Sequence, residues 1–427
     1  MQTEAIVFIE LNGEAVPAGK LQVIEDSRFS TARFAYGRRY LERPDAVALD
    51  PVQMPLDDGL IEAPADYPLF NGIRDAAPDA WGRKLIERHV LRSLNRAAGE
   101  ADFLFASQSG HRIGALRFGP TPKAPGQVLH YALPGGYWDL GSLEEFQAMV
   151  DAFSTGDASA QSVADFVAPG SDLGGARPKG TVVVNGFPWL VKFGLEKDRI
   201  CMAAAEAACL DLCEMAGIDT CKREIIDIAG RKSLMLQRFD RREGEKGIER
   251  IHMLSSLTLL GAHEFDRSAS GYADLHDVAR RYGAGSHGEE IFRRMVMNVL
   301  TGNTDDHYRN HAFLLGADGN YRPSPVYDVT PTLQAGSERS MFLHLGKTGA
   351  GREATLEQAM AGAPSLGLKD DEAAAIVNEL STMVAANWEE RFKARDASRA
   401  DIELVAGAFN QAGRKIEVET DLQAGPR

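Results

Sequence analysis

Three side chains suited to holding a metal-bound phosphate lie close together in the sequence: Asp305, Asn310 and Asp328. The chain between Asn310 and Asp328 has two apolar runs separated by a turn sequence that contains Asp318-Gly319. An Asp-Gly pair between two such runs predicts a β-hairpin. This hairpin would bring Asn310 and Asp328 nearly opposite each other at its open end, with Asp305 one short loop away.

An acid, an amide and a second acid at one place suit phosphoryl transfer. A carboxylate such as Asp305 receives the proton of an attacking hydroxyl, while an amide and a second carboxylate, here Asn310 and Asp328, hold Mg²⁺. The step from Asp305 to Asn310 matches the aspartate-to-asparagine step of the kinase catalytic loop. The segment therefore predicts a kinase-like site.

Two other interpretations of this segment stay open. Residues 302–310 also fit a helix terminus capped by Asn, Thr and Asp side chains. Alternatively, Asp306, His307 and His311 offer the mixed oxygen and nitrogen ligands of a two-metal phosphohydrolase. The hydrolase is disfavoured because the helical part of the sequence has no second histidine–aspartate cluster.

Length and charge restrict the class of protein. A chain of 427 residues predicts two or three domains. The net charge of −14 argues against nonspecific nucleic-acid binding by the whole surface, and leaves DNA contact through a partner protein open. No apolar run approaches the ~18 residues that span a bilayer, and residues 1–20 lack signal-peptide features. We expect a cytoplasmic protein without membrane contact.

All four cysteines lie in one stretch, at Cys201, Cys209, Cys213 and Cys221. Cys209 and Cys213 share a helix face, which allows a zinc site. No Cys-x-x-Cys pair is present, however, and the surrounding sequence is rich in Ala and Leu. We therefore expect reduced thiols in an apolar core.

The order of elements predicts an α+β chain, with a mixed lobe followed by a helical lobe. An N-terminal subdomain is expected over 1–125, a second mixed unit with a glycine-rich turn over 140–245, an all-α unit over 246–415 and a frayed tail over 416–427. Within the first unit, 102–118 has a strand–turn–strand pattern.

The glycine-rich turn is a candidate phosphate-binding loop. Gly174 and Gly175 let the backbone come close to phosphates, where a Cβ would collide. Arg177 and Lys179 add positive charge beside them. No Walker A sequence occurs, so a P-loop fold is not supported. An ordinary surface loop is the alternative.

Two further segments suit a nucleotide site. Lys192 lies in an otherwise apolar strand, where a charge needs a partner, and Glu206 in the following helix is the natural one. Such a pair would place Lys192 on the α- and β-phosphates. Gln237 and Phe239 stand at a strand end where a kinase hinge presents backbone groups to adenine. Alternatively, Lys192 is an edge-strand lysine that points to water, and the segment with Gln237 and Phe239 is a strand end with a charged turn.

Several separate segments in register resemble the HipA family of serine/threonine protein kinases, the toxin halves of bacterial HipBA-type toxin–antitoxin systems. The matching segments run from the first unit to the hairpin, at 70–83, 110–116, 173–179, 238–241, 303–310 and 326–328. Because they occur in the family's order, together they are much more specific than any one motif.

The resemblance implies a bilobal protein-kinase-like fold with a mixed α/β N-terminal lobe and an all-α C-terminal lobe, and the use of ATP and Mg²⁺. By this resemblance, Lys192 is the ATP-binding lysine and Asp305 is the catalytic aspartate. Asn310 and Asp328 are then the metal ligands, and Gln237 and Phe239 form the hinge. Characterised relatives phosphorylate aminoacyl-tRNA synthetases, which slows translation and growth. They also bind a small helix-turn-helix antitoxin, HipB, that represses their operon.

One position departs from the family's pattern. Members commonly autophosphorylate a serine in the glycine-rich loop, and Asp172 falls where that serine belongs. Ser171 is the adjacent hydroxyl and the remaining candidate acceptor. An aspartate carries a fixed single charge in place of a switchable phosphate of about −1.5 to −2. We therefore expect self-inhibition by loop phosphorylation to be absent or weakened.

The expected function is an ATP- and Mg²⁺-dependent protein serine/threonine kinase. Asp305 is expected to act on the acceptor hydroxyl, and Gly174, Gly175 and Lys179 to cover the phosphates. A second hypothesis is a weakly active binding module that acts as corepressor with a helix-turn-helix antitoxin. The phosphohydrolase is the third.

Overall fold

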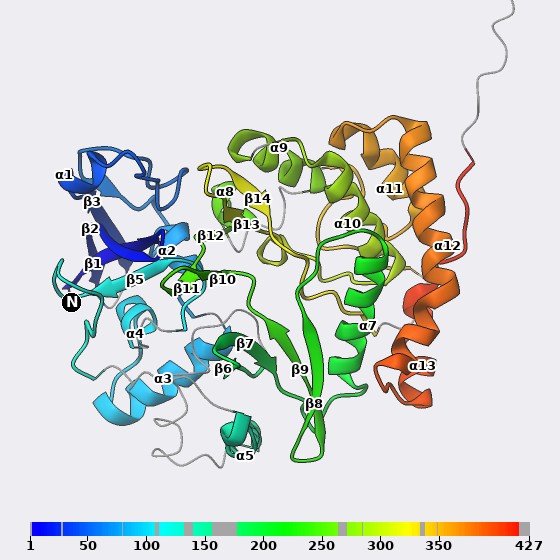
Figure 1. The fold of residues 1–427 in the computed structure, drawn as a ribbon, viewed down its shortest axis with the longest axis horizontal. Coiled ribbons are helices and arrows are strands. Elements are labelled where there is room, and N and C mark those ends of the chain that lie inside the picture. The colour runs from blue at the N-terminus through cyan, green and yellow to red at the C-terminus, as the bar shows by residue number, and fades with distance from the viewer. Residues whose placement is uncertain are drawn as a thin grey trace, which may run out of the picture. The chain divides into compact units, whose positions relative to one another are not determined.

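The computed structural model describes residues 2–26, 29–78, 80–106, 111–131, 140–155, 177–263, 271–283, 285–333, 338–347 and 349–417. The chain divides into two compact units (Figure 1). The first, called the mixed unit, contains Met1–Asp198, Cys221–Glu264 and Ala312–Ser324. The second, called the helical unit, contains Arg199–Thr220, Phe265–His311 and Pro325–Arg427.

The mixed unit begins with an antiparallel sheet. Its strand order is β4 (Ile61–Glu62), β3 (Ser30–Tyr36), β2 (Glu14–Glu25), β1 (Gln2–Leu11) and β5 (Leu116–Gly119). The β1–β2 turn uses Asn12 and Gly13 at φ 50° and 78°. Both residues tolerate a left-handed backbone, so the chain can reverse there. Two short helices accompany the sheet, α1 (Arg38–Leu41) and α2 (Asn71–Asp75).

A second sheet of the mixed unit carries the predicted nucleotide residues. Its order is β6 (Lys179–Val184), β7 (Phe187–Lys192), β9 (Arg231–Gln237) and β8 (Arg223–Ile228). A shared apolar core joins this sheet to α3 (Ala80–Leu94) and α5 (Leu143–Thr155), and contains Trp81, Leu85, Phe146, Val150, Val182 and Val191. This packing provides a rigid support for side chains on β6, β7 and β9.

One secondary-structure prediction for this unit is wrong. The segment 102–118 was expected as strand–turn–strand, yet α4 (Glu100–Phe105) covers its start, and β5 is the only strand among the residues described in it, 102–106 and 111–118. The Asp102 carboxylate accepts the backbone N–H of Gly99 at 2.8 Å and so stabilises the first turn of α4. This capping interaction outweighs the strand-like composition of the segment.

Two small β-structures complete the mixed unit. One is the hairpin of β10 (Arg241–Gly244) and β11 (Gly247–Arg250). The other is a sheet of β12 (Met253–Ser255), β13 (Ala312–Leu315) and β14 (Tyr321–Pro323), with α8 (Ser256–Leu259) after β12. Because β13 and β14 pair antiparallel about Gly319 at φ 78°, the predicted Asp318-Gly319 hairpin is confirmed.

The helical unit consists mainly of helices. They are α7 (Met202–Met215), α9 (Tyr272–Tyr282), α10 (Gly288–Leu300), α11 (Leu356–Gly362), α12 (Asp370–Ala394) and α13 (Arg399–Val405), with the 3₁₀ turns η2 (Tyr308–Asn310), η3 (Ala363–Leu366) and η4 (Ala406–Phe409). In the mixed unit, η1 (Leu140–Ser142) precedes α5. The Arg395 guanidinium binds Asp211 at 2.6 and 2.7 Å and thereby links the end of α12 to α7.

The cysteines behave as small apolar side chains. All four are free thiols, and Cys209, Cys213 and Cys221 are buried. Burial raises the pKa of the Cys209 thiol well above its ordinary value, because the thiolate would lose its water. The prediction of free thiols in an apolar core is confirmed for Cys209, Cys213 and Cys221, whereas Cys201 is only half-buried.

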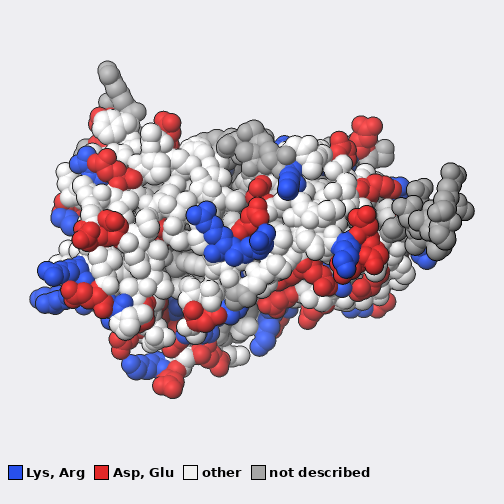
Figure 2. Space-filling view, turned by 90° about the horizontal axis from the view of Figure 1, so that it is seen from above, with Lys and Arg blue, Asp and Glu red and all other residues white. Residues whose placement is uncertain are grey.

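On the face drawn in Figure 2, Lys and Arg side chains are interspersed with Asp and Glu side chains. Among the described residues, no helix has both the length and the apolar character needed to cross a membrane.

Candidate active site

The loop after α10 carries the predicted catalytic aspartate. Gly302 follows the helix with φ 64°, and a Cβ there would lie 2.7 Å from the Ala408 carbonyl oxygen. Glycine is thus required both by the backbone conformation and by the close approach of η4. Beyond it, Asp305 is exposed, whereas its neighbour Asp306 is only 3% exposed. The two adjacent carboxylates therefore have different environments.

Asp306 is the centre of a buried hydrogen-bond network. Its Oδ2 accepts the Tyr272 hydroxyl, the Asn298 amide at 2.8 Å and His311 Nε2 at 2.8 Å. The Asn303 amide in turn donates to Asn298 Oδ1 at 2.8 Å. Burial alone would raise the pKa of Asp306, but the nearby His311 and the Tyr272 hydroxyl lower it below its ordinary value. Asp306 is therefore a buried, ionised structural group.

The pair of Asp306 and His311 brackets the predicted site. Asp305 immediately precedes Asp306, and Asn310 immediately precedes His311. The 2.8 Å contact between Asp306 and His311 thus closes the loop 306–311, which contains Asn310 and directly follows Asp305. A charge-assisted contact in a dry interior is stronger than one at the surface, so this closure fixes the loop ends.

Asn310 contacts the backbone of the aspartate expected to be catalytic. Its Nδ2 donates to the Asp305 carbonyl at 3.3 Å, and its backbone N–H donates to the His307 carbonyl at 2.8 Å. Because the amide nitrogen is used in this way, the amide oxygen points away from the Asp305 carbonyl. Amide oxygens are among the ligands used by hard cations such as Mg²⁺.

Asp328 adopts a backbone conformation that is uncommon for a residue with a side chain. Its φ is 61°, in the left-handed region that aspartate tolerates better than most residues. The Asp328 N–H donates to Glu206 Oε1 at 3.2 Å, so a buried carboxylate of α7 holds this peptide. Such strain is retained where surrounding contacts over-determine it.

A hydroxyl also links the Asp328 segment to the catalytic loop. Tyr327 donates to the Arg309 carbonyl at 2.5 Å. Arg309 directly precedes Asn310, and Tyr327 directly precedes Asp328. This bond therefore joins the two chain segments next to the two predicted metal ligands. An amide oxygen and a carboxylate fit Mg²⁺, which is usually held by one or two carboxylates together with substrate phosphates.

The lysines predicted to bind phosphate lie on the second sheet of the mixed unit. Lys179 on β6 stands directly opposite Lys192 on β7, and Lys179 is buried. Side chains of directly opposed residues project from the same face, so two positive charges are concentrated there. Glu206 lies on α7 and is buried. The pairing of Lys192 with Glu206 stays a prediction.

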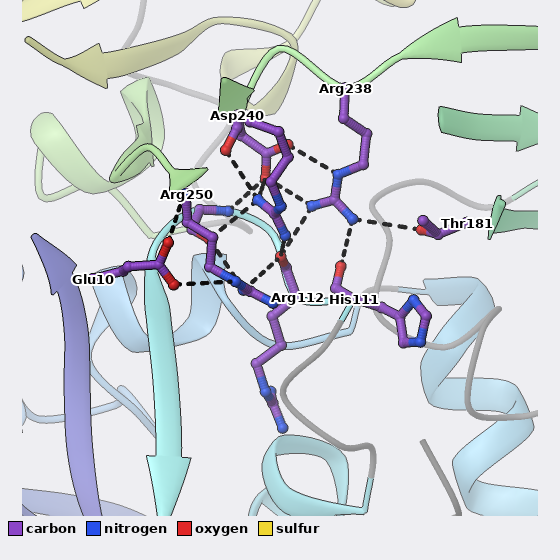
Figure 3. A network of polar contacts seen from close by, with 9 residues as sticks. Glu10, His111, Arg112, Thr181, Arg238, Asp240 and Arg250 are labelled. Carbon is purple, nitrogen blue, oxygen red and sulfur yellow. Dashed lines mark hydrogen bonds and ion pairs between the residues drawn. The ribbon is translucent and has the colours of Figure 1, made fainter. Parts of the chain in front are cut away.

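The hinge residues lie at the end of β9. The Gln237 N–H already donates to the Lys222 carbonyl at 2.8 Å, so a contact between Gln237 and adenine would have to use the Gln237 carbonyl or side chain. Phe239 follows two residues later and is partly buried. Arg238 between them is buried in a charge network that Figure 3 shows.

Part of the predicted phosphate loop is outside the described residues. This applies to Ser171, Asp172, Gly174 and Gly175. Arg177 is described, and its guanidinium forms a bidentate ion pair with Asp198. The positive charge of Arg177 is therefore compensated within the mixed unit.

The sequence of the second half of the chain decides its family. Residues 171–388 match the family model of the HipA-like C-terminal domain, which covers just over half of the chain. The chain belongs to the HipA family. A curated HipA relative, the serine/threonine-protein kinase toxin HipA of Shewanella oneidensis MR-1, is 27% identical over 124 residues. That alignment covers 25% of this chain and 28% of the relative, so it spans well under a third of either protein.

The HipA fold extends over nearly the whole chain. HipA of S. oneidensis MR-1, solved with HipB and operator DNA, has a TM-score of 0.63 and 16% identity, and the match covers 95% of both chains. A lower likeness, with a TM-score of 0.33 and 14% identity over 55% of this chain and 94% of the other, is found to the Helicobacter pylori proinflammatory kinase CtkA. The predicted α+β, kinase-like HipA fold is confirmed by the first of these.

The sequence patterns did not identify the residues that support the loop. Asp306 and His311 were considered only as metal ligands of a hydrolase, yet in the structure they bind each other, with Tyr272 as a further donor to Asp306. The adjacent pair Asp305-Asp306 was the one available signal, because two neighbouring residues in a loop commonly face opposite sides. Tyr327 had no signal beyond its place next to Asp328.

Proposed function

We propose that this chain is an ATP- and Mg²⁺-dependent protein serine/threonine kinase of the HipA type. Its substrate is a cytoplasmic protein, with aminoacyl-tRNA synthetases as the first class to test, and its action slows translation and growth. Family membership supports this assignment, because residues 171–388 match the HipA-like C-terminal domain.

The observation that carries the proposal is the linkage of the loop 305–310 to the segment 326–328. The Asp306–His311 contact closes the loop, and the hydroxyl of Tyr327 binds the Arg309 carbonyl. Together these contacts support one exposed carboxylate, one amide and one carboxylate held by neighbouring backbone. Phosphoryl transfer depends on such positioning and on charge neutralisation, with little covalent chemistry for the protein to perform.

Each residue has a role in the proposal. Asp305 receives the proton of the acceptor hydroxyl as that oxygen attacks the γ-phosphorus, while the bond from the γ-phosphorus to the β,γ-bridging oxygen breaks and ADP leaves. Asn310 and Asp328 hold Mg²⁺, which when bound neutralises charge on the phosphates. Lys192, ordered by Glu206, and Lys179 bind phosphate oxygens, for which the opposed positions of the two lysines on β6 and β7 supply the charge. Gly174 and Gly175 cover the phosphates, while Gln237 and Phe239 contact the base.

A HipB-like helix-turn-helix antitoxin is the proposed partner. The support is the solved S. oneidensis HipA, whose structure contains HipB and operator DNA and whose fold this chain shares. DNA would then be contacted through the partner. The net charge of −14 agrees with this indirect mode.

The test is phosphate transfer from γ-labelled ATP with Mg²⁺ in a cell lysate. Wild-type protein should label a discrete protein band, and Asp305→Asn should not. Asp371→Asn is the matched control, because Asp371 is an exposed aspartate of the same unit at the start of α12. A label that persists at full strength in Asp305→Asn would refute the assignment of the catalytic aspartate.

Other outcomes identify the competing functions. Release of free labelled phosphate without any protein acceptor would favour the phosphohydrolase. Binding of ATP without transfer would favour the binding module and corepressor. Labelling of the kinase itself, lost in Ser171→Ala, would show that the loop hydroxyl is modified despite Asp172.

A further inference from the structure

In two sequence motifs of the family resemblance, 110–116 and 238–241, only Phe239 has a role in the chemistry proposed above. In the mixed unit they are joined by a cluster of buried charges (Figure 3). Arg238, Asp240 and Arg241 are at most 6% exposed. Burying this many charges is costly unless they are closely paired, so the cluster calls for an explanation beyond ordinary packing.

Arg238 uses its whole guanidinium. Nε donates to Asp240 Oδ1 at 2.9 Å, and Nη2 donates to Asp240 Oδ2 at 2.7 Å and to the Arg112 carbonyl at 2.9 Å. Nη1 donates to the His111 carbonyl at 2.6 Å and to Thr181 Oγ1 at 3.4 Å. A guanidinium has five N–H groups, and five acceptors surround this one. Its position therefore has little freedom.

Asp240 balances the charge of two arginines. Its Oδ2 also accepts Arg241 Nη1 at 2.7 Å and the Gly114 N–H at 2.8 Å. Burial by itself would raise the pKa of Asp240, but Arg238 and Arg241 hold it far below its ordinary value. The carboxylate is thus ionised, and its bidentate pair with Arg238 has the geometry of the strongest hydrogen bonds in proteins.

The mutual contacts of Arg238 and Asp240, called the clamp below, flank Phe239 of the predicted hinge. Gln237 immediately precedes Arg238, and its N–H is bound to the Lys222 carbonyl. Phe239 lies between Arg238 and Asp240, whose side chains hold each other. The backbone from Gln237 to Asp240 is therefore fixed on both sides of Phe239. A side-chain contact two residues apart also constrains the peptide groups between them.

We propose that Arg238 and Asp240 are positioning residues that set the base selectivity of the nucleotide site. The inference rests on the proposed function, in which Gln237 and Phe239 present the hinge to adenine. Adenine offers an amino donor beside a ring acceptor on the edge where guanine offers a carbonyl acceptor beside a ring N–H. A site discriminates strongly between such patterns only when its own polar groups are held in place, because the wrong base then leaves them unpaired.

The test compares the dissociation constants of ATP and GTP, each with Mg²⁺, for the full-length protein. Arg238→Lys keeps the positive charge but loses the planar fork that grips Asp240. We expect wild type to prefer ATP and Arg238→Lys to lose that preference on the order of tenfold, the effect of one misaligned hydrogen bond. A general loss of stability would weaken the binding of both nucleotides alike and leave the ratio of their dissociation constants unchanged.

Arg250→Lys is the matched control. Arg250 belongs to the same cluster, with a side chain 7% exposed and Nη1 at 3.4 Å from the carbonyls of both Arg112 and Gly114, but it lies on β11, outside the segment 237–240. Its substitution should keep the ATP-to-GTP ratio of wild type. An equal loss of selectivity in Arg250→Lys and Arg238→Lys would overturn the inference, since the clamp at the hinge would then have no special role.

The remaining outcomes separate this inference from the proposed function. Failure of wild type to bind ATP would reject the proposed function itself. Wild-type binding with an unchanged ratio in folded Arg238→Lys would reject only the clamp. If thermal melting shows Arg238→Lys to be unfolded, Asp240→Glu keeps the buried charge and Thr181→Val removes only the weakest contact of Arg238. An unchanged ratio of the ATP and GTP dissociation constants in these variants would then reject the clamp, as it would in Arg238→Lys.

Discussion

The Tyr327 hydroxyl donates to the Arg309 carbonyl at 2.5 Å, and each of these residues directly precedes a predicted metal ligand. One hydrogen bond thus couples Asn310 in the loop to Asp328 in the segment after the hairpin. The Asp328 peptide is held a second time, by the buried carboxylate of Glu206 at 3.2 Å. The separation of the two ligands therefore depends on contacts outside the ligands themselves.

Tyr327→Phe should weaken Mg²⁺-dependent ATP binding. The phenyl ring keeps the packing but loses the donor, so we expect affinity to fall by about five- to tenfold and stability by about 1 kcal/mol. Titration of ATP at fixed Mg²⁺ measures the effect. Tyr282→Phe, on α9 of the same unit, is the matched control. Unchanged affinity in Tyr327→Phe would contradict the proposed coupling.

Asp306→Ala should be the most destabilising change in the loop. It leaves the donors of Tyr272, Asn298 and His311 without their common buried acceptor, which costs about 3–5 kcal/mol when a buried charged partner is lost. Tyr272→Phe removes one donor and should cost about 1 kcal/mol. Urea unfolding gives both values. Similar values for the two variants would show that Asp306 is not the centre of the network.

Asp305 and Asp328 should separate catalysis from metal binding. Asp305→Asn should lower kcat by roughly 10²–10⁴-fold and keep ATP affinity, because only the proton acceptor is lost. Asp328→Ala should also lose the Mg²⁺ dependence of ATP binding. Addition of EDTA should therefore weaken ATP binding to wild type and to Asp305→Asn, with little further effect on Asp328→Ala. An EDTA response of wild-type size in Asp328→Ala would remove it from the metal site.

His252 should make the mixed unit sensitive to mild acid. Burial lowers the pKa of His252 to about 4, and its Nε2 lies 3.1 Å from the Leu49 carbonyl. In the unfolded chain the same group takes up a proton near pH 6.5, whereas the folded protein does not until about pH 4. The stability contribution is thus fully present above pH 6.5 and is lost as the pH falls towards 4. The loss amounts to roughly 3 kcal/mol.

Urea unfolding at several pH values measures this dependence. His252→Gln keeps an amide donor for the Leu49 carbonyl but does not titrate, so the decline between pH 6.5 and 4 should be smaller in this variant. The same substitution at the exposed His130 is the control and should keep the wild-type decline. Parallel curves for wild type and His252→Gln would exclude His252 as the source.

Local patterns in the sequence were sufficient for most elements. The Asp318-Gly319 turn reverses the chain as predicted, and Asn12-Gly13 and Asn185-Gly186 do so too, because Asn and Gly tolerate the left-handed backbone that these turns require. Residues 100–105 were misread because the cap that Asp102 provides to Gly99 competes with strand-like composition, and composition does not reveal which interaction is stronger.

The sequence alone determined which chemical groups are available: an aspartate, an amide and a second aspartate at kinase-like spacing, and lysines beside a glycine-rich turn. Only the tertiary structure decided their environments. Asp305 and Asp306 are adjacent and chemically identical, yet one is exposed and the other accepts three buried donors. The reason is physical, since the role of a carboxylate depends on its loss of water and on the donors that α9 and α10 bring to it from distant parts of the chain.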